Sequence, residues 1–164
     1  MPKPLKFYIH IMDLLNKGLG YLLAIMLAIM TIVIFAQVFC RYVLGDSLLW
    51  SEELSRYIMV WGVFIGSALA VRYHSLISLE VLPQRLPKNV ANHLRKVVYL
   101  VVVVFCYYLF TNGMEMTQQV TMQKSAALRL SMAIPYSSVP IGTLLIFLNT
   151  VVVFIESLWK GEEA

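Results

Sequence analysis

The side chains best able to do chemistry gather in one short segment, residues 49–57, which reads LWSEELSRY. Glu52 and Glu53 are adjacent acids, and Arg56 follows them by four and three positions, a spacing that favours an ion pair on a helix. Adjacent helical side chains point about 100° apart. Arg56 therefore cannot pair fully with both acids. We expect one carboxylate to bind elsewhere, either in this chain or on a second protein.

Residues arranged for catalysis, cofactor binding or metal binding are not evident. The sequence contains no HExxH, no GxSxG and no glycine-rich phosphate loop. Ser131 and Ser137 lack a His or Lys base within an apolar run, and His10, His74 and His93 all flank such runs rather than lie inside them. We therefore predict that the chain is not an enzyme and has no catalytic, cofactor or metal site.

The composition indicates a membrane protein. The chain has 164 residues, of which 60% are hydrophobic and 13% charged, whereas an ordinary soluble domain is roughly 45–50% apolar. The mean hydropathy is +0.76. A bilayer crossing takes about 20 residues, so the charge-free runs predict an all-α integral membrane protein with one domain, residues 1–164, and four transmembrane helices. Their expected ranges are 19–40, 57–71 as the end of a helix from 47, 97–114 and 130–155.

The segments that flank these runs carry helix signals of their own. Asp46 or Ser47 is a suitable N-cap for the second helix. The residues before the first run, with Tyr8, Met12 and Leu15 at helical spacing, predict an amphipathic helix on the membrane surface. The first run is too long for a cleavable signal peptide, so we expect it to remain as an anchor.

The basic residues predict an orientation. If both termini are cytoplasmic, most of the 13 lysines and arginines lie on the cytoplasmic side, and Arg41, Arg56, Lys124 and Arg129 lie outside. This distribution follows the positive-inside rule. It explains the net charge of +4 by contact with membrane lipids, so we expect no nucleic-acid partner.

Small residues in two runs suggest close helix packing. Gly62 and Gly66 form a GxxxG motif, and Gly20 and Ala24 repeat the same step in the first run. Such stripes let helix backbones approach, either between the first two spans of this chain or on a helix of a partner. Pro135 and Pro140 predict an irregular start of the fourth span.

The segment 37–87 resembles the small membrane subunit of the tripartite ATP-independent periplasmic (TRAP) transporters. That family has a Gln and an Arg-Tyr pair at the end of its first span, then Trp-x-Glu-Glu-x-x-Arg-Tyr, then a Trp and a glycine in the second span. After that span it has a histidine, a hydrophobic residue and an acid. The matching residues here are Gln37, Arg41, Tyr42, Trp50, Glu52, Glu53, Arg56, Tyr57, Trp61, Gly66, His74, Ile77 and Glu80, with the histidine region matching loosely. The segment from Ile134 to Gly142 is also similar.

The resemblance implies a multi-pass subunit of the bacterial inner membrane that binds no substrate itself. It would brace a large multi-span TRAP membrane subunit and help dock a periplasmic substrate-binding protein during sodium-coupled uptake, by symport, of an organic acid of the sialic acid or dicarboxylate type. A stand-alone four-helix transporter and a membrane anchor subunit of an oxidoreductase are the alternatives. The first needs an acid inside a span and the second needs buried haem-ligating histidines.

The hypothesis for the partner interface follows from these residues together. It comprises Trp50, Glu52, Glu53, Arg56, Tyr57, Trp61, Gly62 and Gly66. Gln37 and Arg41 are expected to be structural residues at the membrane interface. The sequence leaves open which organic acid is carried and which faces contact the large subunit.

Overall fold

The computed structural model describes residues 3–46, 48–73 and 88–160. Its elements are α1 (Lys3–Phe39), the π-helical turn η1 (Cys40–Leu44), α2 (Leu49–Arg72), α4 (Lys88–Gln119), the short α5 (Ala133–Tyr136) and α6 (Ser138–Lys160). Four helical segments in this part of the chain are long and apolar enough to cross a membrane. The predicted all-α fold with four transmembrane helices is confirmed.

Helix α1 is longer than the sequence indicated. The residues before the first apolar run are helical, as expected, but they continue without a break into the span and do not form a separate surface helix. The side chains on one side of this segment pack inside the protein, where Met12 and Asn16 are buried. Contact with the rest of the chain, rather than with the membrane surface, explains why the segment extends the span.

The turn between α1 and α2 differs from the expected capping. Gly45 follows η1 with φ 74°, a left-handed conformation that glycine adopts without strain. Helix α2 then begins at Leu49, with Leu48 as the N-cap residue and no side-chain cap. The predicted Asp46 cap is therefore wrong. The Ser47 alternative and residues His74, Ile77, Glu80 and His93 lie outside the part described, or have side chains outside it.

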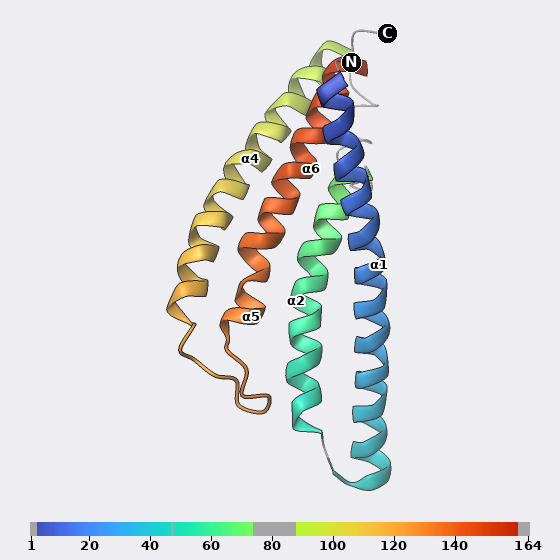
Figure 1. The fold of residues 1–164 in the computed structure, drawn as a ribbon, viewed down its shortest axis with the longest axis vertical. Coiled ribbons are helices and arrows are strands. Elements are labelled where there is room, and N and C mark those ends of the chain that lie inside the picture. Colours follow the sequence, from blue (N-terminus) through green and yellow to red (C-terminus); the bar gives the residue numbers. More distant parts are fainter. Residues whose placement is uncertain (1–2, 47, 74–87, 161–164) are drawn as a thin grey trace.

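The four long helices form a layer rather than a closed bundle (Figure 1). Helix α2 packs between α1 and α6, and α6 packs between α2 and α4. Within the described residues α4 contacts neither α1 nor α2. The start of α1 and the end of α6 lie at the same end of the layer, where the helices converge, and at the other end α4 and α1 diverge (Figure 1). Because each helix has few neighbours, most large apolar side chains face outward.

Glycines mark the closest approaches in this layer. A Cβ atom built on Gly142 of α6 would lie 2.8 Å from Cγ of Phe64 in α2, and one built on Gly113 of α4 would lie 2.8 Å from Val139 of α6. Both distances are too short for real side chains. These two glycines therefore allow α6 to pack closely against its two neighbours.

The segment between α4 and α5 folds as a small hairpin, residues 123–132. The Ser125 N–H donates to Leu130 O at 2.8 Å, and the Met132 N–H donates to Gln123 O at 2.9 Å. Helix α5 ends at Tyr136 and α6 begins at Ser138. The two prolines therefore accompany a break at the start of the fourth span, as the sequence predicted.

We expect Gly142→Ala to destabilise the fold by about 1–3 kcal/mol, because its methyl group overlaps Phe64 and forces α2 and α6 apart. Thermal unfolding of the purified protein in detergent measures the effect. Gly18→Ala is the matched control, since a Cβ there meets no atom within 4 Å. Equal stability of the two variants would contradict the close packing.

Candidate functional site

The two adjacent acids bind different parts of the chain. Glu52 Oε1 accepts a hydrogen bond of 3.0 Å from Gln37 Nε2 on α1. Glu53 accepts the backbone N–H groups of Ala127 and Leu128 at the hairpin tip, at 3.0 and 2.9 Å, one on each carboxylate oxygen. The expected divergence of the two side chains is observed, and each carboxylate contacts this chain.

Arg56 is exposed, and within the described residues it forms no ion pair with either acid. The predicted pairing of Arg56 with Glu52 or Glu53 is therefore wrong. The physical reason is that each carboxylate has other donors. Two convergent backbone N–H groups bind a carboxylate in a fixed geometry, whereas an exposed arginine on the same helix contributes little to stability.

Tyr57 and Trp61 continue the same face of α2 and also hold the segment before α6. The Tyr57 hydroxyl lies 3.4 Å from Met132 Sδ. The Trp61 indole N–H donates to Ile134 O at 3.2 Å, and the Ser137 hydroxyl donates to the same oxygen at 2.7 Å. A helix break leaves backbone carbonyls without helical partners, and in a membrane such groups need side-chain donors. Trp61 is therefore a specific support of the break between α5 and α6.

The remaining predicted residues divide into two groups. Cβ atoms built on Gly62 and Gly66 would lie 3.5 and 3.7 Å from Leu23 of α1, so this GxxxG face packs within the chain, the first of the two readings left open by the sequence. Trp50 is 43% exposed, and Arg56 and Arg41 are exposed as well. Trp50, Arg41 and Arg56 therefore have exposed surface that is available to a partner.

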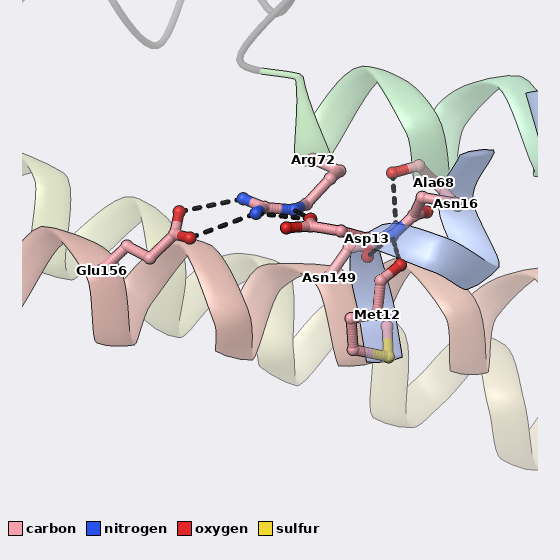
Figure 2. A network of polar contacts seen from close by, with 7 residues as sticks. All are labelled: Met12, Asp13, Asn16, Ala68, Arg72, Asn149 and Glu156. Atoms are coloured by element: carbon pink, nitrogen blue, oxygen red, sulfur yellow. Dashed lines mark hydrogen bonds and ion pairs between the residues drawn. The ribbon is translucent and has the colours of Figure 1, made fainter. Parts of the chain in front are cut away.

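A second polar cluster joins three helices at the end where α1 begins (Figure 2). Arg72, the last residue of α2, donates two parallel hydrogen bonds to Glu156 of α6, at 2.9 and 3.1 Å. Its Nε donates to Asp13 of α1 at 2.8 Å. The Arg72 side chain is 11% exposed, against 49% for Asp13 and 21% for Glu156. The guanidinium is thus the buried centre of the cluster.

Two asparagines extend this cluster toward the membrane interior. Asn16 and Asn149 exchange amide hydrogen bonds of 2.7 and 2.9 Å between α1 and α6. Asn16 also donates to Met12 O, and Asn149 also donates to Ala68 O of α2. Both asparagines are fully buried. Away from water a buried amide without partners is costly, so these bonds specify how α1, α2 and α6 meet.

Neither cluster is arranged for catalysis. Within the described residues no group of three His, Cys, Asp or Glu side chains is placed to hold a metal ion. Apart from the bond of Asn16 to Met12 O within α1 and that of Ser137 to Ile134 O, the bonds described in the two clusters join one helix or segment to another. Their chemistry is that of structural crosslinks, one at each end of α2.

Sequence reasoning missed the second cluster although a signal for it was present. Asp13, Arg72 and Glu156 all flank predicted spans, and the predicted topology places all three at the same membrane face. Opposite charges at one depth on three helices indicate an ion pair. Asn16 and Asn149 are far apart in the sequence, so no local pattern indicates their contact.

A known protein family matches most of the chain. Residues 30–160 match the model of the DctQ component of tripartite ATP-independent periplasmic transporters. The chain belongs to this family. Its members are components of transporters rather than enzymes. The match includes Gln37, the acidic pair, the hairpin and α6, whereas Asp13 and Asn16 precede it.

Individual relatives support this assignment. The chain is 32% identical to a putative TRAP transporter small permease protein of Haemophilus influenzae, over 58% of this chain and 59% of that protein. It is 34% identical to the C4-dicarboxylate TRAP transporter small permease protein DctQ of Vibrio cholerae, over 52% of this chain and 35% of that protein. The sialic acid TRAP transporter small permease protein SiaQ of the same species is 26% identical, over 74% and 68%. The chain thus covers less than two thirds of the length of the first two relatives.

We expect Glu53→Gln to loosen the hairpin, because an NH2 donor replaces one of the two oxygens that accept the Ala127 and Leu128 N–H groups. Hydrogen exchange at these two amides should become about tenfold faster or more. Glu52→Gln is the matched control, since Glu52 binds Gln37 instead. Equal exchange at the hairpin tip in both variants would contradict the assigned contact.

We expect Arg72→Met to destabilise the fold by about 2–3 kcal/mol, since it leaves two carboxylates without their cation. Asp13→Asn should cost least, because Asp13 is the most exposed of the three. The triple variant R72M/D13N/E156Q should recover part of the loss, because no charge is then left unpaired. Thermal unfolding in detergent measures the order, and a triple variant less stable than R72M would contradict it.

Proposed function

We propose that this protein is the non-catalytic small permease subunit of a TRAP transporter in the bacterial inner membrane. In this proposal it braces a large multi-span membrane subunit and helps to dock a periplasmic substrate-binding protein during sodium-coupled uptake of an organic acid. The observation that carries the proposal is the layered arrangement of α1, α2, α6 and α4. Such a layer has broad outer faces for a partner and little interior.

The distribution of charge favours a subunit that braces a partner over a chain that carries ions or substrate itself. Charged side chains with assigned contacts lie near helix ends, in the Arg72 and Glu53 contacts of α2 and in the contact of Glu115 with Gln119 on α4. Intramembrane ionisable groups mark ion and substrate pathways, and the middle of each span has none. A stand-alone transporter or a haem-binding anchor subunit would need such groups.

Two longer relatives support a large partner. The sialic acid TRAP transporter permease protein SiaT of Haemophilus influenzae is 31% identical over 78 residues, which make up 12% of that protein. The isethionate TRAP transporter permease protein DctMQ of Oleidesulfovibrio alaskensis is 28% identical over 131 residues, 20% of its length. In these proteins a segment like this chain is joined covalently to a much larger remainder. We propose that the present protein likewise works together with a large membrane subunit.

The hairpin supports the proposed docking role. With both termini cytoplasmic, residues 123–132 emerge on the periplasmic side with Trp50 and Arg56. The hairpin carries Lys124 and Arg129 and no acid, and Glu53 holds its tip from α2. A cationic loop with a fixed shape suits an acidic surface on a soluble partner.

The substrate stays at the level of an organic acid. The relatives named for C4-dicarboxylates, sialic acid and isethionate all differ, and the residues that recognise substrate would lie on the other subunits. We propose a sialic acid or dicarboxylate type, which uptake assays with each labelled acid would separate.

We expect the protein to co-purify with a large multi-span subunit encoded nearby. Uptake in reconstituted vesicles should need both membrane chains, the binding protein and a sodium gradient. Uptake by this chain alone would refute the proposal.

The variant Lys124→Ser/Arg129→Ser should slow uptake at low binding-protein concentration while co-purification is unchanged, because only the docking surface loses charge.

A further inference from the structure

Helix α4 forms one open edge of the layer, and its outward side carries polar groups. Residues along this side recur at steps of three and four and define the α4 outer stripe: Val97, Val101, Val104, Tyr108, Asn112, Glu115 and Gln119. The stripe lies on the side of the helix opposite Gly113 and the buried Cys106. Its first half is apolar and its second half polar.

The polar half is not satisfied within the described part of the chain. Asn112 donates one hydrogen bond, to Tyr108 O of its own helix, and no partner reaches its side-chain oxygen there. The Tyr108 side chain is 61% exposed. Glu115 accepts a hydrogen bond from Gln119 Nε2 on its own helix and meets no cation in the described residues.

The depth of these groups makes contact with lipid unfavourable. Asn112 lies seven residues before Gln119, the last residue of this span, hence roughly 10 Å inside the end of the helix. In the interior of a bilayer an amide oxygen without a partner has no water to bind. A protein surface that supplies a donor removes this cost.

The opposite edge of the layer has a different chemistry. The outward side of α1 carries large apolar groups such as Ile25, Ile32 and Phe35, all strongly exposed. The hydroxyl of Thr31, in the same stretch, is bonded to Leu27 O. This side suits lipid acyl chains. The two edges of the layer are therefore suited to different neighbours.

We propose that the α4 outer stripe is the attachment surface for a transmembrane helix of the large permease subunit, and that this helix carries a hydrogen-bond donor opposite Asn112 and a cationic side chain opposite Glu115. The inference rests on the proposed function and specifies its contact face. Charge complementarity at Glu115 selects a partner with a cation at that depth. A second copy of this chain with the same stripe would place acid against acid.

Site-specific photo-crosslinking in the native membrane tests the contact face. A photoreactive amino acid at position 108 or 112 should crosslink to the large subunit, and the same group at Ile32 or Phe35 of α1 should not. Crosslinks to the large subunit from α1 alone, or from α4 to a second copy of this chain, would overturn the inference. Failure to recover any large subunit would instead refute the proposed function.

Substitution of Asn112 is expected to weaken retention of the large subunit if the stripe contacts protein, but not if it contacts lipid. Asn112→Leu removes a polar group and should weaken retention of the large subunit about tenfold if the stripe docks a helix. The isolated chain should be as stable as before or more so, which separates docking from folding. Ile32→Leu on α1 is the control. Retention equal to the wild type in Asn112→Leu and in Glu115→Lys would overturn the inference.

Discussion

Away from water a buried amide or charged group needs hydrogen-bond partners within the protein, and the contacts between the helices of this protein meet that constraint. Arg72 is the clearest case. Its guanidinium binds Glu156 through two parallel hydrogen bonds and Asp13 through a third, so a single side chain joins three of the four long helices. Asn16 and Asn149 join α1 to α6 in the same way, through neutral amides that lie closer to the membrane interior. These bonds add specific joints between helices to a layer whose buried apolar interior is small.

Side chains in the first half and the middle of α2 bind backbone groups of other segments. Glu53 binds two N–H groups of the hairpin, and Trp61 binds the carbonyl of Ile134 at the break between α5 and α6. Helix α2 is thus fixed by the Glu53 carboxylate near its start, by the Trp61 indole at its middle and by the Arg72 guanidinium at its end. This makes α2 the element on which α1, α6 and the hairpin are placed, whereas among the described elements α4 packs against α6 and α5 only.

Much of the fold was accessible from the sequence, because charge-free runs of sufficient length have no alternative to spanning helices in a bilayer. The four spans were anticipated on this basis, the irregular start of the fourth span from Pro135 and Pro140, and the TRAP family from the resemblance of residues 37–87. The acidic pair was singled out correctly, but its partners were not. Pairing with Arg56 was inferred from local spacing. In the structure the two carboxylates instead accept hydrogen bonds from Gln37 and from hairpin N–H groups, which are distant in the sequence.

By itself the sequence determined which segments enter the membrane and that their interiors carry no charge, since hydropathy and charge act on each segment separately. Only the tertiary structure decided the order of the helices in the layer, the joining of Asp13, Arg72 and Glu156, and the use of Gly113 and Gly142 for close approach. These features depend on which helix faces rest against each other. In a membrane that choice is made by shape and by hydrogen bonds between distant residues, because lipid is as apolar as the helices themselves.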